Sequence, residues 1–465
     1  MPTTWLESPT ETGTVVPSDT DFDINYCNFV NPQWVKLLNT LQMNAQYTRC
    51  TGTELHPADG RVILDFLSGY CVHNTGHNHP DILEALKTEL DRRGPAMLQS
   101  HVAATAGDLA QALCKRAGGR ISKAFFSSSG SEGVESAIKF SRAYTGRNGL
   151  LYCDGAFHGL TCGALSLMGD PFWKQGFGSM LADTQAVPFN DIPALERALA
   201  TRRFGAFFVE PLQSESGIRL ADPDYFRRAR EICKRYDTLL VIDEVQTGMY
   251  RTGRFLCCHR YGADPDMVVM AKALSGGLVP VAATLMTDEI YGSVYNSLKR
   301  SIVHTSTYSE NGLSMRAGLA TLEVLEREQL GDRAELMGEI LRSKLREALS
   351  GFEMVKDVRG LGLLNGIEFT APGKLGLRLP FEGFMAIHPG MFGQVIVLRL
   401  YRDHGILAQI CGNNFLTLKV APPLVVTEAQ LDHFVASIRE VVHLMHTSSS
   451  FWSEALGMAR RVVNI

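Results

Sequence analysis

Short apolar runs alternate with amphipathic stretches along the chain from about residue 80 to residue 272. The apolar runs are rich in β-branched and aromatic residues and have polar, glycine or proline boundaries, which is typical of buried strands. They are KAFFSSS (123–129), LLYC (150–153), AVPF (186–189), FGAFFVEP (204–211), LLVID (239–243) and DMVVMAK (266–272). The amphipathic stretches repeat apolar residues at helical spacing, at 80–94, 105–119, 131–146, 191–203 and 223–237. This alternation predicts an α/β protein with a mostly parallel sheet sandwiched by helices.

The pattern changes after residue 272. PVAATLMTDEI (280–290) indicates an antiparallel-type strand, and two long helices follow at 311–329 and 333–350. From about Met354 the runs predict a smaller α+β unit that ends in a helix capped at Thr427. We expect residues 371–391 to form a long loop. The predicted organisation is an N-terminal segment (1–60), a large domain (61–350) and a small C-terminal domain (351–465).

Composition narrows the functional classes. The formal net charge of −4 gives no electrostatic reason to expect nucleic acid or an anionic membrane as a partner. No apolar run is long enough to suggest a membrane span, and the N-terminus lacks the features of a signal peptide. Ten cysteines without a CxxC pair indicate reduced thiols and a cytoplasmic location. The histidines of CVHNTGHNHPD lie in a loop without metal-ligand spacing, so we expect no metal site.

Two of the apolar runs end at a charged residue that a dry core would not tolerate unpaired. LLVID ends at Asp243 and DMVVMAK ends at Lys272. Ligands of open α/β sheets bind at the carboxyl ends of the strands. Pyridoxal 5'-phosphate needs an amine that forms its Schiff base and a carboxylate that keeps its ring nitrogen protonated. The alternative is that Asp243 caps a turn while the Lys272 ammonium extends to solvent.

Other strand ends carry groups that suit the same ligand. Gly130 and Ser131 begin a predicted helix, where free N–H groups and the helix dipole favour a phosphate. In GAFHGLT (155–161), Phe157 is placed to stack on a flat ring, with His158 beside it as a further cofactor contact. Glu210 ends a buried strand at the same edge. Each feature alone has a purely structural interpretation, and their joint occurrence favours a cofactor site.

These segments resemble class III aminotransferases, the ω-aminotransferase group of fold-type I pyridoxal-phosphate enzymes. The resemblance covers residues 123 to about 325 and extends into the C-terminal unit through GLGLLNGIEF and LKVAPPL. The motifs that carry it are SSSGSEGVESAIKFSRAYTGR, GAFHGLT, VEPLQSESG, LLVIDEVQTGMYRTGRF, DMVVMAKALSGG and HTSTYSENGLSMRAGLATLEVL. It implies a large domain with a mostly parallel sheet and a smaller α+β domain built from the C-terminal and N-terminal segments.

The resemblance also implies individual roles. Lys272 is similar to the Schiff-base lysine, and Asp243 to the partner of the pyridine nitrogen. Val245 resembles the residue on the second face of the ring, and Gln246 the one near its hydroxyl group. Thr307 resembles a threonine that reaches the phosphate of the neighbouring subunit. The family is therefore expected to form a homodimer with active sites at the interface.

The chain departs from its family at the positions that recognise substrate carboxylates. Leu160 stands where relatives that use glutamate or 4-aminobutyrate carry an arginine, which can pair with a glutamate matching Glu215. Lys419 stands where many relatives place a second arginine, and a lysine cannot bind a carboxylate with a bidentate fork. We therefore consider two roles for Glu215, attraction of a cationic group on the substrate or pairing with Lys419.

The leading interpretation is an aminotransferase that acts on a primary amine or amino acid, including diamines and ω-amino acids, with a 2-oxo acid as the other substrate. A second interpretation keeps the cofactor and changes the outcome to decarboxylation, racemisation, γ-elimination or carbon–carbon bond formation. A third is a cofactor-binding scaffold without catalysis, which the joint presence of Lys272 and Asp243 argues against.

Overall fold

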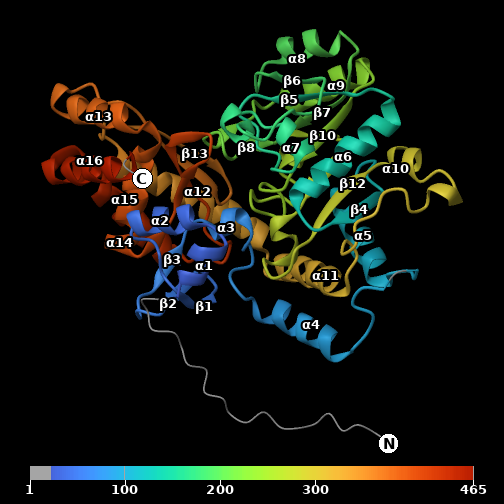
Figure 1. Ribbon diagram of the computed structural model, residues 1–465, viewed down its shortest axis with the longest axis horizontal. Coiled ribbons are helices and arrows are strands. Elements are labelled where there is room, and N and C mark those ends of the chain that lie inside the picture. Colours follow the sequence, from blue (N-terminus) through green and yellow to red (C-terminus); the bar gives the residue numbers. More distant parts are fainter. Residues whose placement is uncertain (1–21, 99, 464–465) are drawn as a thin grey trace, which may run out of the picture.

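The computed structural model describes residues 22–98 and 100–463, so the first 21 residues of the expected N-terminal segment lie outside the described part. Figure 1 shows two lobes. One contains the largest sheet with helices on both of its faces, and the other brings the C-terminal helices together with the N-terminal strands.

The largest sheet has seven strands in the order β4-β12-β11-β10-β7-β5-β6. In that order their bounds are Lys123–Ser127, Ala282–Met286, Met267–Met270, Leu239–Asp243, Phe204–Val209, Gly149–Cys153 and Thr184–Val187. β11, β10, β7, β5 and β6 pair in parallel, whereas β12 runs antiparallel to both β11 and β4. The predicted α/β sheet and its antiparallel strand are confirmed.

Alternate residues of the central strand β10 face two separate cores, as the two-residue period of a strand requires. Leu239 and Val241 pack with α6 (Gly130–Thr145) on one face of the sheet. Leu240 and Ile242 pack on the other face. That face is covered by α5 (Ala104–Ala117), α8 (Ile192–Leu199) and α9 (Tyr225–Arg235). Burial on both faces explains why β10 reads as a continuous apolar run.

The second lobe contains two four-stranded sheets, in the orders β1-β2-β3-β15 and β13-β14-β17-β16. β15 pairs in parallel with β3, so a C-terminal strand completes the N-terminal sheet. The strands are β1 Tyr47–Thr51, β2 Glu54–Pro57, β3 Ile63–Asp65, β13 Val355–Leu361, β14 Leu364–Phe369, β15 Ile406–Leu407, β16 Gln409–Cys411 and β17 Asn414–Val420. The helices of this lobe include α2 Pro32–Thr40, α12 Leu330–Leu349, α13 Leu375–Ile387, α14 Phe392–His404, α15 Glu428–Thr447 and α16 Ser449–Val463.

The prediction of a loop at 371–391 is wrong, because most of these residues form α13. Pro380 lies inside this helix, although a proline in a helix interior usually breaks or kinks the helix. Phe381 and Phe384 are buried, and both pack against Phe392; Phe381 also meets Trp452 of α16. Burial of these rings stabilises the helix despite the proline. The capped helix predicted at Thr427 is confirmed as α15, which begins with a capping box formed by Thr427 and Gln430.

The remaining elements connect the two lobes and surround the large sheet. They are α1 Ile24–Phe29, α3 Ser68–Cys71, α4 Pro80–Asp91, α7 Cys162–Ser166, α10 Asp288–Val294, α11 Gly312–Arg327, β8 Leu212–Gln213, β9 Arg219–Leu220, and short 3-10 turns including η1 Pro171–Lys174 and η3 Lys272–Ser275. Arg251 is fully buried. Its guanidinium donates hydrogen bonds to Asn74 Oδ1 and to the carbonyl oxygens of Leu363 and Pro422. These bonds connect segments that are far apart in the sequence.

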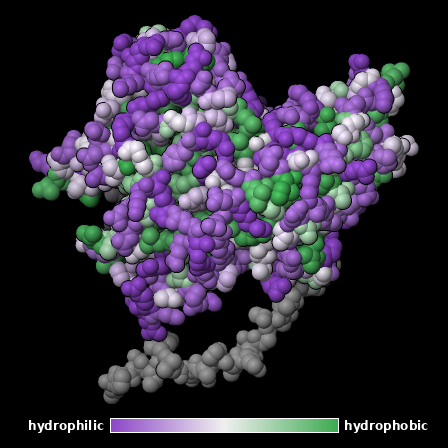
Figure 2. Space-filling model, turned by 180° about the vertical axis from the view of Figure 1, so that it is seen from behind, coloured by the Kyte–Doolittle hydropathy of each residue, from purple (hydrophilic) through white to green (hydrophobic). Residues whose placement is uncertain are grey.

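The surface is mostly polar. Figure 2 shows that hydrophilic residues dominate one face of the molecule and that hydrophobic residues gather there in separate patches. Within the described residues, no single helix is long and apolar enough to cross a membrane. Taken together, α13 and α14 have the length and composition of a membrane span, but the two helices are bent by 103° relative to each other. All ten cysteines lie in the described part and none forms a disulfide.

Candidate active site

The candidate site lies where five strands of the large sheet end. β11, β10, β7 and β5 are parallel, and β4 points the same way because β12 is antiparallel to both of its neighbours. The segments that follow these strands line one cavity of about 460 Å³. The sheet therefore gathers residues from 128 to 281 at a single edge, as open α/β sheets do for their ligands.

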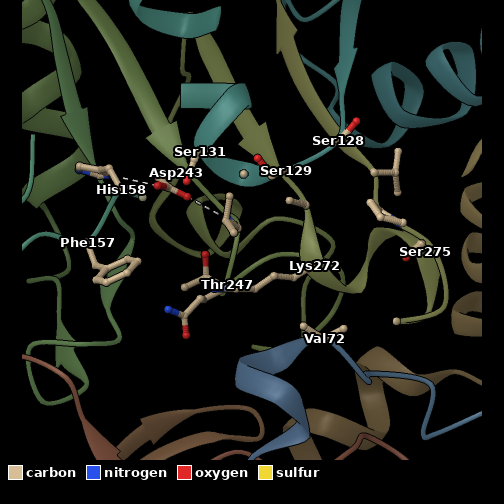
Figure 3. A pocket seen from close by; sticks show the side chains of 18 of the residues that line it. Val72, Ser128, Ser129, Ser131, Phe157, His158, Asp243, Thr247, Lys272 and Ser275 are labelled. Atoms are coloured by element: carbon tan, nitrogen blue, oxygen red, sulfur yellow. Dashed lines mark hydrogen bonds and ion pairs between the residues drawn. The ribbon is translucent and has the colours of Figure 1, made fainter. Parts of the chain in front are cut away.

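The side chains of Asp243 and Lys272 come from neighbouring strands and line this cavity together (Figure 3). Asp243 is the last residue of β10 and pairs in register with Val269 of β11. Lys272 follows three residues after Val269, beyond the end of β11. The solvent-exposed alternative considered for the Lys272 ammonium is not what the structure shows.

Lys272 occupies an unusual backbone conformation. Its φ angle of +49° is in the left-handed region, which costs a non-glycine residue about 1–3 kcal/mol. Gly276 and Gly277 follow with φ angles of +62° and +82°. Burial lowers the pKa of the Lys272 ammonium. The strained turn thus holds an amine that loses its proton more readily than an exposed lysine.

Asp243 is held by two hydrogen bonds. Its Oδ2 contacts His158 Nδ1 at 2.8 Å, and its Oδ1 accepts from the Val245 N–H at 3.0 Å. Asp243 is only 6% exposed and His158 only 3%. Burial opposes the charged imidazolium, but the hydrogen bond and charge of Asp243 raise the pKa of His158. The two contacts hold the Asp243 carboxyl group in place at the wall of the cavity.

The first turn of α6 offers donors for a phosphate. Ser129 caps the helix, and its capping box with Glu132 uses the N–H groups of Ser128, Ser129 and Glu132. The N–H groups of Gly130 and Ser131 are left for an anion at the positive end of the helix. A Cβ at Gly130 would lie 3.1 Å from Val245, so glycine keeps this wall of the cavity open.

Phe157 and Val245 line the same cavity and come from different strand ends. The Phe157 N–H donates to Glu210 Oε1 at 3.0 Å, which ties the GAFHGLT loop to the end of β7. A flat aromatic ring fits between an aromatic and a branched aliphatic side chain. Together, an amine, a carboxylate, free helix N–H groups and two apolar walls fit pyridoxal phosphate.

The protonation of Glu210 leads to a prediction on pH. Burial raises the pKa of Glu210 to about 7, although the charge of His158 partly opposes this. The folded state then binds this proton more tightly than the unfolded state. The contribution of protonated Glu210 to stability is complete below the pKa that Glu210 has in the unfolded chain. This contribution falls by about 3 kcal/mol as the pH rises to 7.

We expect Glu210 to lower the unfolding free energy of cofactor-free protein, measured in urea, between pH 4.5 and 7, whereas His73 and His304, whose pKa values burial lowers to about 4, act in the opposite direction. Burial also raises the pKa of Glu244 to about 7, so Glu210 and Glu244 both lower the unfolding free energy as the pH rises. Glu210→Gln keeps an oxygen that can accept from the Phe157 N–H and is expected to remove a fall of about 3 kcal/mol from the dependence of the unfolding free energy on pH. An unchanged slope in this variant would show that Glu210 is ionised throughout.

Glu215 pairs with Lys419, which is the second of the two roles considered for it. The Lys419 ammonium donates to Glu215 Oε1, and both side chains are buried. Glu215 also accepts from Gln246 Nε2 and from the Gly412 N–H, each at 2.9 Å. Burial favours the neutral acid, but Lys419 and these donors lower the pKa of Glu215 to about 2. The carboxylate is fully engaged inside the protein.

Four predicted site residues do not line the cavity, namely the paired Glu215 and Lys419 together with Leu160 and Thr307. Leu160 is 52% exposed and lines a separate apolar cavity. Thr307 lines another cavity of about 850 Å³ together with His304 and Arg316. The other predicted cofactor residues, Gly130, Ser131, Phe157, His158, Glu210, Asp243, Val245, Gln246 and Lys272, all line the cavity at the sheet edge.

Ser129, Thr247 and Ser275 also line the cavity, although none of them was predicted as a site residue. The signal for Ser129 was present, because a serine three residues before a glutamate at a helix start indicates a capping box. Thr247 and Ser275 lie one to three residues beyond Gln246 and Lys272, in turns whose geometry the sequence does not specify.

The fold and the cavity define a fold-type I enzyme whose cofactor is pyridoxal phosphate. The chain belongs to the class III aminotransferases, since the model of that family matches residues 38–442. It is 34% identical to aminotransferase PigE of Serratia sp. (strain ATCC 39006) over 93% of this chain, and it spans about half of that protein's length (54%). It is 35% identical to the mitochondrial ornithine aminotransferase of Rattus norvegicus, over 85% of each chain.

A solved ornithine aminotransferase from Toxoplasma gondii has the same fold. Its TM-score is 0.81 at 26% identity, and the match covers 93% of this chain and 96% of that one. That structure is described as having pyridoxal phosphate at partial occupancy in its active site. The fold class and the family inferred from the sequence motifs are confirmed.

Proposed function

We propose that this chain catalyses transfer of an amino group from a primary amine or amino acid to a 2-oxo acid. In that exchange R–CH2–NH2 becomes R–CHO while the 2-oxo acid becomes an amino acid, so atoms and electrons balance. The observation that carries the proposal is the convergence of Asp243 and Lys272 on one cavity at the sheet edge. An aminotransferase needs both groups around one cofactor.

Each side chain has a defined task. Pyridoxal phosphate supplies a carbonyl carbon for the amino group and a ring that withdraws electrons from the substrate. Because its pKa is lowered, the Lys272 amine can accept the proton from the substrate Cα and can later donate that proton again. Asp243 would hold a proton at the ring nitrogen of the bound cofactor, and His158 keeps the Asp243 carboxyl group in place. Phe157 and Val245 line the same cavity and would supply apolar contact to the ring.

The range of amines follows from the relatives. Proteins named ornithine aminotransferase and putrescine aminotransferase are 35% and 30% identical to this chain. A diamine or an ω-amino acid is therefore within the proposed substrate range. The Glu215–Lys419 pair supports looser recognition of carboxylates than an arginine would provide, because the Lys419 charge is already neutralised.

The stoichiometry of product formation tests the proposal. Without a 2-oxo acid, an aminotransferase converts about one equivalent of amine per active site and stops, because the amino group has no acceptor. We expect this single equivalent with purified holoenzyme and one of ornithine, putrescine or benzylamine, and steady turnover after pyruvate is added. Continuous product formation without an acceptor would instead indicate decarboxylation or elimination, and a protein that converts no amine would be a scaffold.

We also propose that the enzyme is a homodimer with active sites at the interface. The segments that line the Thr307 cavity carry strongly exposed apolar side chains, including Val102 (90%), Leu298 (94%) and Ile302 (78%). Exposed apolar groups of this kind support contact with another chain. Sedimentation velocity is expected to give twice the chain mass of 51.2 kDa; a single-chain mass at micromolar concentration would contradict this.

The cytoplasmic location stays a prediction. Ten unpaired cysteines support it, because free thiols persist in reducing compartments. Fractionation of the producing cells, with the protein detected by an antibody, would test it, and recovery with secreted proteins would contradict it.

A further inference from the structure

Ser214 is a buried polar residue that reaches the cofactor cavity through another side chain. It directly follows β8 and is 0% exposed, and it is not among the residues that line the cavity. Its Oγ contacts Gln246 Oε1 at 2.9 Å. Gln246 does line the cavity and lies three residues after Asp243. The Ser214 hydroxyl therefore acts on the wall of the cavity through the Gln246 amide.

The charge of Glu215 decides which end of the Gln246 amide faces which neighbour. Gln246 Nε2 donates to Glu215 Oε1 at 2.9 Å. Burial favours the neutral acid, but Lys419 and the donors around Glu215 lower its pKa to about 2, so at neutral pH this carboxylate can only accept. A rotated amide would place its oxygen against a carboxylate oxygen. The amide oxygen therefore faces Ser214, and the Ser214 hydroxyl is the donor.

Glu215 is itself held by residues of the second lobe. The Lys419 ammonium of β17 donates to Glu215 Oε1, and the Gly412 N–H donates to Glu215 Oε2 at 2.9 Å. The Asn413 N–H donates to the Glu215 carbonyl oxygen at 2.8 Å. Lys419 is 0% exposed, so water does not compete for its ammonium. The position of the Gln246 amide is thus set by both lobes.

The Gln246 amide keeps a second N–H. A primary amide has two N–H donors, and among the described residues Gln246 Nε2 donates one of them, to Glu215. Gln246 is only 9% exposed and lines the cavity. A molecule bound in the cavity is therefore the acceptor that the second N–H can gain.

Pyridoxal phosphate carries one polar group that has no partner in the account of the cavity so far. Lys272 suits its aldehyde, Asp243 suits its ring nitrogen, and the first turn of α6 suits its phosphate. The ring hydroxyl group remains. When this group is ionised, its oxygen gains from an N–H donor and is repelled by an amide oxygen.

We propose that Ser214 is a positioning residue for the cofactor. Together with Glu215, it holds the Gln246 amide in the one orientation that offers an N–H, and not the amide oxygen, to the ring hydroxyl oxygen of bound pyridoxal phosphate. This inference rests on the proposed function, because it takes the cofactor of an aminotransferase as the bound molecule.

Removal of the Ser214 hydroxyl tests the proposal through cofactor binding. Ser214→Ala leaves Gln246 Oε1 without its donor, so the amide is free to rotate. We expect the dissociation constant of pyridoxal phosphate, measured by titration of cofactor-free protein with tryptophan fluorescence as the signal, to rise about three- to tenfold, which is the range of one hydrogen bond. The visible absorbance maximum of the bound cofactor is expected to shift, because its ring oxygen loses a donor. Ser214→Gly also lacks the hydroxyl and is expected to give the same result.

A second substitution shows whether Ser214 acts through Gln246. Gln246→Met removes the amide and keeps a side chain of similar length. In this background Ser214→Ala is expected to change the dissociation constant less than twofold, whereas independent effects would add. Ser141→Ala is the matched control, since Ser141 is equally buried and its Oγ donates to the Ala137 carbonyl oxygen at 2.7 Å, within α6 and outside the cavity. This control is expected to keep the wild-type dissociation constant and absorbance.

Three results would overturn the inference and leave the proposed amino transfer intact. The first is a wild-type dissociation constant in folded Ser214→Ala or Ser214→Gly protein. The second is a lower unfolding temperature with an unchanged dissociation constant, which would make the hydroxyl purely structural. The third is an equal effect of Ser214→Ala with and without the Gln246 amide. Wild-type protein that binds no pyridoxal phosphate would overturn both the inference and the proposed function.

Discussion

Lys272→Ala is expected to reduce kcat by about 10⁴-fold or more, because loss of a positioned proton carrier alone accounts for two to four orders of magnitude. The variant is also expected to lose the covalent bond to the cofactor that we propose for Lys272. We expect the folded protein and its dimer to persist, since Lys272 lies in a turn after β11 and donates no hydrogen bond that the fold needs. The measurements are steady-state kinetics, the visible absorbance of the bound cofactor, and sedimentation.

The matched control is Lys234→Ala, which removes an exposed lysine of α9 outside the cavity and should keep full activity. A small amine such as methylamine is expected to restore part of the activity of the Lys272 variant, since it can carry the same proton. Lys272→Ala protein with wild-type turnover would show that another residue carries the proton.

Asp243→Asn is expected to lower kcat by about 10³-fold, because it removes one preorganised charge while leaving the shape of the site intact. An asparagine can still accept from the Val245 N–H, so the turn after β10 is expected to persist. It carries no negative charge to hold a proton at the ring nitrogen. The electron-withdrawing capacity of the cofactor is therefore reduced, while its binding through the first turn of α6 is retained.

Two measurements separate this effect from misfolding. The variant should bind one cofactor per chain and should unfold at a temperature close to that of the wild type. Wild-type kcat in Asp243→Asn would refute the role of Asp243. Loss of both cofactor and fold would assign Asp243 to the structure instead of to the reaction.

The central part of the fold could be predicted because it depends on local patterns. β10 and β11 are buried on both faces, so their sequences are continuous apolar runs. The charge at the end of each run is costly unless a ligand needs it, which identifies Asp243 and Lys272 together. The antiparallel β12 could also be recognised from its different pattern.

Other features depend on contacts between distant residues. Glu215 and Lys419 are 204 positions apart, so the sequence left two roles for Glu215 open. α13 forms despite Pro380 because its phenylalanines pack on α14 and α16, which no local pattern shows. The apolar cavity combines Leu160 with rings from the short turn η1, a segment without a recognisable motif. Thr307 lies in a separate cavity, and a role at the cofactor would require a second chain.

We propose that Lys272 holds the cofactor covalently at the edge of the large sheet, and this bond can be tested directly. Reduction of the holoenzyme with sodium borohydride makes a lysine–cofactor bond permanent, and peptide mapping by mass spectrometry then identifies the modified lysine. We expect one phosphopyridoxyl group per chain, on Lys272, and none in the Lys272→Ala protein. Modification of a different lysine, or of many lysines at low yield, would contradict it.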